Sequence, residues 1–440
     1  MASPPNILFV LCDQLGARWL PLHGHPIVAT PHLERFATES TVFQRAITTS
    51  PICTPYRGCL FSGRYPSQTG LLENGGAFPP GLTSIADHLN SAGYSSHYVG
   101  KWHLSGPPQQ NRWVPPDKRA GFQNFIGWES HHVDHFGGLI WEDDPTVPLE
   151  MNGHETDALT DIALAQLSKA ACAAQPFLLM LSYQAPHPPC SPPKRYRALY
   201  ERRDLLREAN AESSAWFKME SWKADYDIET FRQLYFGEIS HLDAAFGRLL
   251  RALDEAGLRD KTLVIFTSDH GEMAGARGLF GKGLMYEEAL HVPLVIRAPG
   301  QRSGLRTDFT ASTVDLLPTI LDYAGCAPDE HAEGVSLRPC IEGTMGAQDR
   351  VAISEYRNFC ASTRNWKLFT QGRALEPTAL YNIADDPFEM NNLIDDPACA
   401  DQRVHLSLEL EKWHRRVQSD NAIVNAAVSE SEARWSRANI

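Results

Sequence analysis

Polar side chains that could do chemistry follow four runs of this chain that are predicted to form strands. The runs and the residues behind them are Ile7–Cys12 with Asp13 and Gln14, Tyr94–Val99 with Lys101 and His103, Phe177–Leu181 with His187, and Leu263–Thr267 with Asp269 and His270. Each residue by itself has an ordinary explanation, such as a helix cap or a hydrogen-bonded turn histidine. In an open α/β sheet, however, ligands bind beyond the carboxyl ends of the strands. The shared position of these residues therefore predicts one binding site.

A cysteine and an arginine lie between the first two of these groups, in the sequence Cys53-Thr54-Pro55-Tyr56-Arg57. Pro55 suits the first position of a helix, which would place Cys53 just before the helix N-terminus. That end of a helix attracts anions through its free backbone N–H groups and its dipole. Arg57 adds a forked cation one turn later. The ordinary alternative is a buried structural cysteine.

The elements that must position these residues predict an α/β fold, with a large, mostly parallel sheet flanked by helices. Continuous apolar runs are typical of strands buried on both faces of such a sheet, and Val292–Ile296 is a further run of this kind. Helices are expected where apolar residues recur at helical spacing and a glycine follows. These helices run from Thr83 to Leu89 before Gly93, from Phe231 to Leu253 before Gly257, and from Val314 to Tyr323 before Gly325.

The pattern changes from about Arg350 onward. Short strand-like pieces lead to one terminal helix, on which Leu406, Leu410, Trp413 and Val417 share a face. The pieces are Val351–Tyr356, Trp366–Thr370 and Leu380–Ile383. We therefore predict a catalytic α/β domain over residues 1–346 and a smaller α+β subdomain, with a small antiparallel sheet and a terminal helix, over residues 347–440.

Composition excludes several classes of protein. The chain has 440 residues, of which 43% are hydrophobic and 21% charged, and its formal net charge is −13. These values exclude a disordered chain, and the acidic balance argues against nucleic acid as a partner, because neutralising phosphates requires a basic face. No export signal and no apolar run of membrane-spanning length is visible. Nine cysteines without paired spacing then predict a reducing, cytoplasmic setting.

A series of short motifs runs through nearly the whole chain. They are Asp13, Cys53-x-Pro55-x-Arg57, Ser62–Pro66, Gly100–Leu104, Ala185–His187, Ser268–Glu272, Lys282 with Tyr286–Glu288, and Leu380–Asn382 with Asp386–Glu389. In type and order they resemble the sulfatase family, which lies within the alkaline phosphatase superfamily. Gln14 and His270 stand where many members have Asp and Asn, and both resemble the branch that contains choline sulfatases and phosphonate monoester hydrolases. Tyr56 replaces a residue that is commonly small in the family.

The resemblance implies that a dedicated formylglycine-generating enzyme oxidises Cys53 to formylglycine, whose hydrated aldehyde is the nucleophile. It also implies one divalent metal ion, usually calcium, held by Asp13, Asp269, His270 and residue 53, with Gln14 as a further ligand through its amide oxygen. Oxygen ligands suit calcium, whereas the imidazole admits manganese as a competitor, and magnesium is a further possibility. The expected substrate is a small sulfate ester.

The resemblance assigns roles to the remaining residues of the set. Lys101 and Lys282 supply positive charge to the sulfate oxygens, and Arg57 orients the nucleophile. His187, with Lys282, binds sulfate and protonates the leaving oxygen, and His103 accepts the proton of the second hydroxyl of the hydrated aldehyde. The aldehyde then re-forms and inorganic sulfate leaves.

Two other functions remain open from the sequence. One is a phosphonate monoester or phosphodiester hydrolase with the same nucleophile and metal, and the other is a catalytically silent binding protein with an unmodified cysteine. The alcohol part of the substrate and the oligomeric state are not determined; the loops expected to form the pocket are Trp113–Asp144 and Cys190–Asp227. Further polar residues are interpreted as surface or pocket residues, because their spacing does not demand a metal: they are Glu272, His131, His132 and His135.

Overall fold

An eight-stranded sheet forms the centre of the protein. The computed structural model describes residues 4–107, 112–129, 132–173, 175–201, 203–206, 208–219, 224–346 and 350–419. Across the sheet the order is β12 (Leu305–Ser312), β2 (Thr41–Ile47), β11 (Leu294–Arg297), β10 (Thr262–Ser268), β1 (Asn6–Asp13), β7 (Phe177–Pro186), β3 (Ser95–Lys101) and β4 (Asn124–Trp128). Only β11 runs against its neighbours β10 and β2 in this sheet, so the prediction of a mostly parallel sheet is confirmed.

The central strand β1 explains why the sheet needs cover on both faces. Side chains alternate between the two faces of a strand: Leu8 and Val10 join one hydrophobic layer, and Phe9 and Leu11 join the other. Both layers are buried. A strand of this kind cannot lie at a wet surface, and helices must cover both sides.

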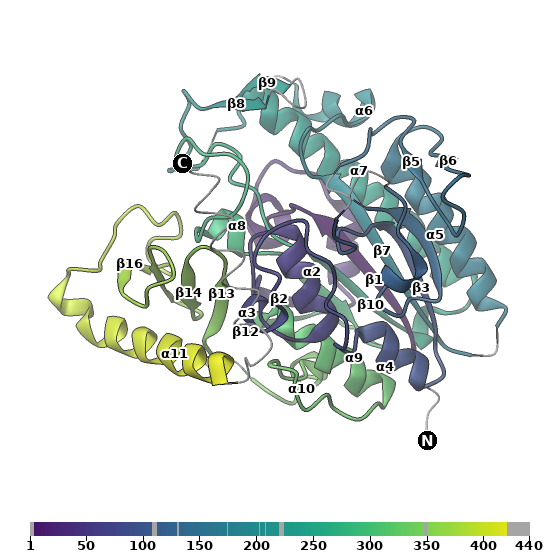
Figure 1. The fold of residues 1–440 in the computed structure, drawn as a ribbon. Helices are drawn as coiled ribbons and strands as arrows, with labels where there is room; N and C mark the ends of the chain where they lie inside the picture. The colour runs from purple at the N-terminus through teal and green to yellow at the C-terminus, as the bar shows by residue number, and fades with distance from the viewer. Residues whose placement is uncertain are drawn as a thin grey trace.

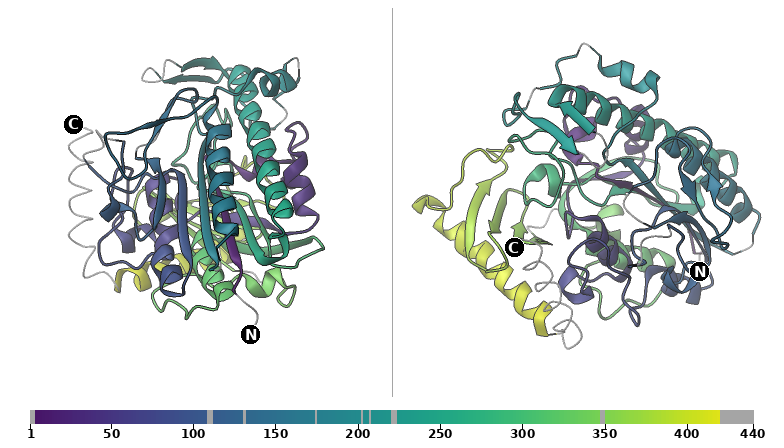
Figure 2. Two further views of the ribbon diagram at one scale, coloured as in Figure 1. Left: turned by 90° about the vertical axis from the view of Figure 1, so that its right-hand side faces the viewer. Right: turned by 45° about the horizontal axis from the view of Figure 1, so that its top comes forward.

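Helices cover the two faces as that argument requires, as Figures 1 and 2 show. One hydrophobic layer includes α1 (Pro31–Ala37), α5 (Glu155–Ala171) and α7 (Ile228–Glu255). The other includes α2 (Cys53–Ser62), α4 (Ile85–Ser91), α9 (Leu316–Ala324) and α10 (Arg338–Ile341). Short helices are α3 (Pro66–Thr69), α6 (Lys194–Arg197) and α8 (Glu287–Leu290). Among the described residues, none of the helices combines the length and the apolar composition needed to cross a bilayer.

Single turns of 3-10 helix and two small ribbons complete the connections. The turns are Ala17–Trp19, Pro21–His23, Pro116–Lys118, Ala198–Tyr200, Arg259–Lys261, Thr313–Asp315 and Pro397–Cys399. The ribbons pair β5 (Leu139–Ile140) with β6 (Leu149–Glu150), and β8 (Trp216–Met219) with β9 (Ala224–Asp227).

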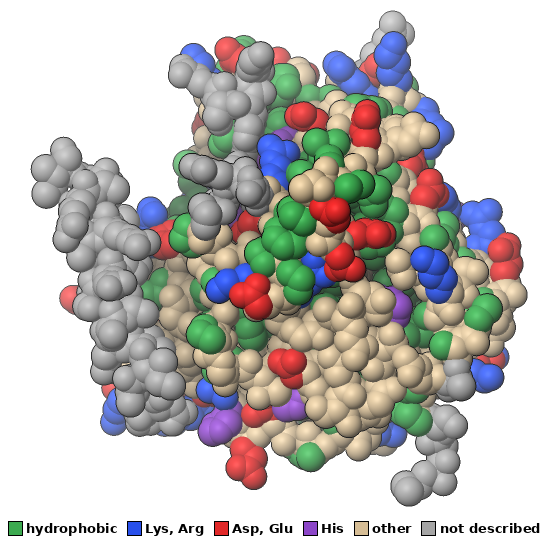
Figure 3. Space-filling view, turned by 45° about the vertical axis from the view of Figure 1, so that its right-hand side comes forward, with side chains coloured by type: hydrophobic (Ala, Val, Ile, Leu, Met, Phe, Trp, Pro, Cys, Tyr) green, Lys and Arg blue, Asp and Glu red, His purple; other side chains and the backbone are tan. Residues whose placement is uncertain are grey.

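The segment around β5 and β6 is exposed and carries acidic side chains at Glu142, Asp143, Asp144 and Glu150. Figure 3 shows one face of the molecule, on which a group of acidic side chains lies beside hydrophobic ones.

The C-terminal part is a small subdomain with its own core. Its antiparallel sheet has the order β13 (Ala352–Glu355), β14 (Phe359–Ser362), β15 (Trp366–Thr370) and β16 (Pro377–Asn382). The helix α11 (Ala400–Ser419) packs on this sheet through Leu406, Leu410, Trp413 and Val417, and Figure 1 shows the two side by side. The division of the chain at residue 346 stays a prediction, and residues 347–349 and 420–440 lie outside the described residues.

Two details of the expected elements were wrong. The helix expected to begin at Thr83 is capped by Ser84, whose side chain accepts the N–H of Asp87. The expected strand at Val292 begins at Leu294. Eight strands were not expected: β2, β4, β5, β6, β8, β9, β12 and β14.

Candidate active site

Four parallel strands deliver charged residues to the same edge of the central sheet. β1 ends at Asp13, β3 ends at Lys101, and β10 ends one residue before Asp269. β7 ends at Pro186 and is followed by His187. These strands are neighbours in the order β10, β1, β7 and β3, and all four side chains are buried. The single site predicted from the strand ends is therefore assembled in the structure.

Cys53 begins the helix α2, which points its N-terminus into this site. The structure corrects the expected position by two residues: Ile52 precedes the helix, Cys53 is its first residue and Pro55 its third. Proline is tolerated there because the first N–H groups of a helix have no partner within it. The side chain of Cys53 thus lies in the positive field of the first helical turn.

Charged groups surround the Cys53 sulfur. Lys282 Nζ lies 3.0 Å from Sγ, His270 Nε2 3.3 Å, Asp13 Oδ1 3.8 Å and Lys101 Nζ 3.9 Å. Each of these residues was predicted for the site, and they come from four separate segments of the chain. Only the tertiary structure brings them within contact of one atom.

This environment distinguishes Cys53 from the other cysteines. Burial and Asp13 raise the pKa of its thiol, but Lys101, Lys282 and His270 together lower it to about 5. Burial instead raises the pKa of the thiols of Cys12, Cys190 and Cys360. All nine cysteines lie in the described residues and none forms a disulfide. A reactive cysteine needs an electropositive environment, and Cys53 has one.

Asp13 and Asp269 are two buried carboxylates with opposite pKa directions. Burial raises the pKa of Asp13, but Lys101, whose Nζ lies 2.5 Å from Oδ2, and other cationic neighbours hold it well below its usual range. Burial, and next the nearby Asp13, raise the pKa of Asp269 to about 6. Two like charges in one buried place are costly unless a cation lies between them.

The donor set fits a metal ion. Ligand atoms of Asp13, Cys53, Asp269 and His270 all lie within 4.8 Å of one another. Asp269 Oδ2 and Gln14 Oε1 are buried and make no hydrogen bond. Gln14 has a φ of 71°, and its backbone N–H donates to Asp269 Oδ1 at 2.9 Å. Buried oxygens without a hydrogen bond are costly, and a hard cation would satisfy both of these.

Arg57 ties this group to the strand ends. Its guanidinium is fully buried. One nitrogen, Nη1, donates to the carbonyl oxygen of Lys101 at 2.8 Å and to Ser182 Oγ at 2.9 Å, and Nη2 lies 3.4 Å from Asp13 Oδ2. A permanent positive charge is thereby fixed beside the Asp13 carboxylate.

His103 and His187 are buried imidazoles on two strand exits. Burial lowers the pKa of both rings well below the usual value, and the next contribution comes from Lys101 for His103 and from Lys282 for His187. The carbonyl oxygen of His103 accepts a hydrogen bond from the hydroxyl of Thr54 at 2.9 Å, directly beside Cys53. A lowered pKa favours the neutral ring, which is the form that accepts a proton.

Glu272 has a role that the sequence interpretation missed. It is fully buried rather than a surface residue. Its Oε2 accepts a hydrogen bond from Gln14 Nε2, and its Oε1 accepts the N–H groups of Ala274 at 2.9 Å and Gly281 at 2.6 Å. The carboxylate thus orients the Gln14 amide and holds the loop beside Lys282. Glu272 lies three residues after Asp269 in the same motif, and this closeness in sequence could have indicated that it belongs to the site.

Of the other histidines in this set, His135 does not lie at the surface. His135 is buried, and its Nε2 lies 2.6 Å from the carbonyl oxygen of Pro189, so it is not a surface residue. His132 is half-buried, and His131 lies outside the described residues.

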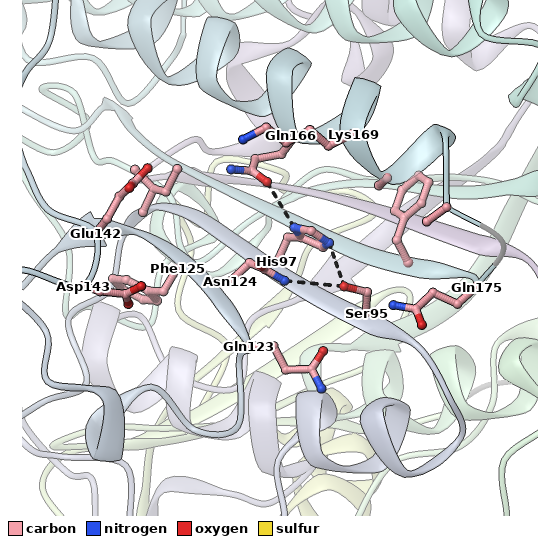
Figure 4. A pocket seen from close by; sticks show the side chains of 14 residues that line it. Ser95, His97, Gln123, Asn124, Phe125, Glu142, Asp143, Gln166, Lys169 and Gln175 are labelled. Carbon is pink, nitrogen blue, oxygen red and sulfur yellow. Dashed lines mark hydrogen bonds between the residues drawn. The ribbon is translucent and has the colours of Figure 1, made fainter.

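A separate cavity lies at the other edge of the sheet. Figure 4 shows its polar lining, with His97 between Ser95 and Gln166. It has a volume of about 360 Å³ and shares no residue with the site around Cys53. Its lining includes Ser95 and Phe177, where β3 and β7 begin. Ligand sites of open α/β sheets lie at the carboxyl ends of the strands, which favours the site at Cys53.

Known proteins resemble this chain over nearly its full length. The family model described as Sulfatase matches residues 5–326, and one described as N-sulphoglucosamine sulphohydrolase, C-terminal, matches residues 275–416. An ulvan-active sulfatase of Formosa agariphila is 31% identical, and the match covers 93% of this chain and 81% of that protein. A choline-sulfatase of Rhizobium meliloti is 30% identical over 98% of this chain and 90% of that protein. The structure of a phosphonate monoester hydrolase of Silicibacter pomeroyi has a TM-score of 0.77 and 25% identity, and covers 94% of this chain and 95% of that one.

Proposed function

The chain belongs to the sulfatase family and hydrolyses sulfuric esters, and we propose that it does so with a formylglycine made from Cys53 and one divalent metal ion. The observation that carries this proposal is the position of Cys53, buried at the start of α2 against Lys282, Lys101, Asp13 and His270. In the mature enzyme, oxygen atoms of the modified residue would take the place of this sulfur. The modification itself would be made by a formylglycine-generating enzyme.

The formylglycine would supply two hydroxyl groups in its hydrated form, one to attack sulfur and one to expel the sulfate afterwards. An unmodified cysteine or a serine has no second hydroxyl. Arg57 is placed to orient this residue, because its guanidinium is locked by Lys101 and Ser182. It lies one helical turn after residue 53 on α2, so the two share a rigid element.

The metal ion would be held by Asp13, Gln14, Asp269, His270 and residue 53. Bound there, it would neutralise charge on the sulfate and acidify a hydroxyl of the modified residue. The carboxylate and amide oxygens favour calcium, and His270 keeps manganese as an alternative. Gln14 Oε1 and Asp269 Oδ2, which are buried and make no hydrogen bond, support this ligand set.

Lys101 and Lys282 would bind the sulfate oxygens. Their ammonium nitrogens lie 3.9 Å and 3.0 Å from Cys53 Sγ. Lys101 is fully buried and the Lys282 side chain is only 15% exposed, so both charges lie where little water screens them and electrostatic stabilisation of a transition state is strong.

His187 and His103 would move the protons. We assign His187 to the leaving-group oxygen, because it follows a different strand from Lys101 and lies beside Lys282. We assign His103 to the second hydroxyl of residue 53, because its carbonyl oxygen accepts a hydrogen bond from the hydroxyl of Thr54, the next residue in the chain. The lowered pKa of His103 suits a proton acceptor, whereas His187 must first bind a proton before it can donate one to the leaving oxygen.

Peptide mass spectrometry and a substrate panel test the proposal. Residue 53 should have lost the sulfur and two hydrogens of cysteine and gained one oxygen. An aryl sulfate should be cleaved, and removal of the metal by a chelator should abolish cleavage until calcium or manganese is restored. An unmodified Cys53 in a fully active preparation would contradict the proposed nucleophile. Unmodified Cys53 together with no activity would instead favour a binding protein.

A second function, hydrolysis of phosphonate monoesters or phosphodiesters, is favoured by one specific observation. The chain matches the Silicibacter pomeroyi phosphonate monoester hydrolase structure over 95% of that chain. The same nucleophile and metal would serve both reactions. Rates of hydrolysis of an aryl sulfate and an aryl phosphonate ester with the same leaving group distinguish the two functions, because the substrates differ only in the transferred group. The loops around residues 113–144 and 190–227 would select the alcohol.

A further inference from the structure

The loop that carries His187 is fastened at both of its ends by hydrogen bonds. Before the loop, the Gln184 side chain exchanges two hydrogen bonds with the backbone of Val133, at 2.7 Å and 3.0 Å. The backbone N–H of His187 donates to the carbonyl oxygen of Gln184 at 3.0 Å. At the other end, the backbone N–H of Ser191 donates to Oε1 of Glu238 on α7 at 2.8 Å. His187 therefore lies between an anchor on its own strand and an anchor on a neighbouring helix.

His135, from the loop between β4 and β5, holds the middle of the same loop. Its Nε2 lies 2.6 Å from the carbonyl oxygen of Pro189, and because a carbonyl oxygen only accepts hydrogen bonds, this nitrogen carries a proton. Its Nδ1 forms an ion pair with Glu155 Oε1 at 3.7 Å. Burial lowers the pKa of His135, but Glu155 and Glu238 raise it to about 9. The ring is thus a cation at neutral pH.

Glu238 is a fully buried carboxylate among imidazoles. Its Oε1 lies 3.6 Å from His154 Nε2, and the facing atoms of Glu238, His154 and His241 lie within 4.8 Å of one another. Burial raises the pKa of Glu238, but His135, His154 and His241 lower it to about 2. The carboxylate is therefore ionised at neutral pH, and a charged acceptor binds the Ser191 N–H more strongly than a neutral one.

We propose that Glu238 is a positioning residue for His187, a role that rests on the proposed sulfatase function. Its carboxylate would hold Ser191 directly, and Pro189 through the positive ring of His135. Both contacts fall within four residues of His187. A shift of about 1 Å in a reacting group can cost about a hundredfold in rate, so the loop must be held closely if His187 is to serve the leaving oxygen.

The competing interpretation is that Glu238 only stabilises the fold. The loop and α7 pack closely in any case, since a Cβ at Gly237 would lie 2.8 Å from Pro192 Cγ. A loss of stability lowers the folded fraction, and with it the rate for every substrate by the same factor. Displacement of His187 instead lowers the rate most where the leaving oxygen is basic. The dependence of the rate on the leaving group therefore separates the two interpretations.

Rates of hydrolysis for sulfate esters with leaving groups of graded basicity test this role. Glu238→Ala removes the acceptor, and Ser191→Pro removes the N–H donor at an exposed residue while the buried carboxylate stays in place. Both variants should lose about tenfold more rate with an alkyl sulfate than with nitrophenyl sulfate. Glu238→Gln keeps an oxygen acceptor and should recover most of that difference. Equal losses for every leaving group in Glu238→Ala would overturn the proposal.

Asp243→Ala is the matched control on the same helix. Asp243 is also buried on α7, and its carboxylate also accepts backbone N–H groups, those of His32 at 3.0 Å and Leu33 at 2.7 Å. These belong to α1 and not to the loop of His187. Any loss of rate in this variant should be the same for all leaving groups.

Crystal structures of the wild type and the variants give a readout that needs no activity. The His187 ring should be displaced by about 1 Å or more in Glu238→Ala and stay in place in Asp243→Ala. An unmoved His187 in Glu238→Ala overturns the proposal, whatever the rates. A displaced ring together with an inactive wild type contradicts the proposed sulfatase function alone, so the two failures can be told apart. If Glu238→Ala does not fold, Ser191→Pro takes its place in both measurements.

Discussion

At the scale of single residues, the chemistry centres on one sulfur atom. Cys53 is held by a helix start, two lysines, a histidine and a carboxylate. The electrostatic pull of the cations exceeds the effect of burial, since its thiol pKa falls to about 5. Two sets of neighbours then matter: those that touch residue 53 and those, such as Glu272, that hold them in place.

Replacing Cys53 by serine should lower turnover at least about a hundredfold. Serine has one hydroxyl, so it can accept the sulfuryl group but cannot expel it. Intact-protein mass spectrometry after incubation with an aryl sulfate should show a sulfated enzyme. Cys172→Ser, an exposed cysteine at the end of α5, should retain wild-type turnover. A serine variant as active as the wild type would contradict the role of the second hydroxyl.

His103→Ala and His187→Ala should slow different steps. A proton donor matters most when the leaving oxygen is basic, so His187→Ala should lose little rate with nitrophenyl sulfate and about a hundredfold or more with an alkyl sulfate. His103→Ala should lose rate equally for all substrates and accumulate the covalent intermediate. A rate series over leaving groups of graded basicity, with quenched samples analysed by mass, separates the two. Equal losses for every leaving group in His187→Ala would exclude it as the proton donor.

Glu272→Gln should weaken the metal site without touching the substrate. The new amide would present a donor to Gln14 Nε2, so the Gln14 amide would turn and lose the oxygen that faces the metal. Loss of such a supporting contact costs about 10- to 100-fold in metal affinity. Calorimetric titration of the metal-free protein with calcium measures this, and Glu212→Gln, at an exposed glutamate, is the control. Unchanged calcium affinity would show that Glu272 acts on the loop alone.

At the scale of elements, close approaches of the backbone set where the ligands lie. A Cβ at Gly271 would lie 1.8 Å from the carbonyl oxygen of Glu288 in α8, so only glycine fits beside His270. A Cβ at Gly100 would lie 2.1 Å from the carbonyl oxygen of Ser182, which keeps β3 against β7 just before Lys101. These glycines let strand ends and loops meet at the site.

The long helix α7 holds two loops through one buried arginine. Arg232 is fully buried and donates to the carbonyl oxygens of Ala274 at 2.9 Å and Leu205 at 2.6 Å, and it pairs with Glu208. Burial raises the pKa of Glu208, but the contacts of His25 and Arg232 lower it to about 2. The ionised carboxylate therefore stabilises the folded state.

Glu208→Gln should destabilise the protein at neutral pH and less so in acid. A carboxyl whose pKa is lower in the folded than in the unfolded state contributes its full stability above about pH 4.5, and loses it as pH falls toward about 2. We expect the free energy of unfolding of Glu208→Gln to be lower than that of the wild type by about 1–3 kcal/mol at pH 7. Denaturant unfolding of the wild type and of Glu208→Gln from pH 7 to pH 3 measures this loss. The difference between their free energies of unfolding should shrink as the pH falls over that range. A pH-independent difference would mean that ionisation of Glu208 is not the cause.

At the scale of the whole molecule, buried charges join the C-terminal sheet to the catalytic part. Lys367 on β15 is fully buried, lies 3.1 Å from Glu287 Oε1 on α8, and also pairs with Glu389. Arg45 on β2 binds Glu287 through both of its terminal nitrogens, at 2.7 Å and 3.0 Å. Because α8 follows the loop of Lys282, this junction also borders the active site.

Lys367→Met should therefore lower stability strongly, by about 3 kcal/mol or more, because removal of one buried partner leaves the carboxylates uncompensated. The thermal unfolding temperature measures it. Lys412→Met, which breaks an exposed pair with Glu409 on α11, should change stability by less than about 0.5 kcal/mol. Similar shifts in both variants would show that the buried junction carries no special stability.

Much of the site follows from local sequence. Apolar runs such as Ile7–Cys12 identify the central strands because a strand buried on both faces needs an unbroken apolar sequence. The residues after those runs, Asp13, Lys101, His187 and Asp269, are then placed at one sheet edge by the parallel topology alone. The α/β fold was predicted correctly on this basis, and the sulfatase family was predicted correctly from the resemblance of the motifs around Cys53, Asp269 and the other site residues.

Other features depend on contacts between distant segments and leave no local signal. Strand β2 is half polar in sequence, yet it is buried because β11 and β12 flank it. Glu272 is hydrogen-bonded to Gln14, 258 residues away in sequence, and His154 packs against His135 and pairs with Glu238 because α5 and α7 meet there. Sequence determines which side chains exist and how each strand or helix forms. Their burial and partners depend on long-range packing, and only the tertiary structure decides them.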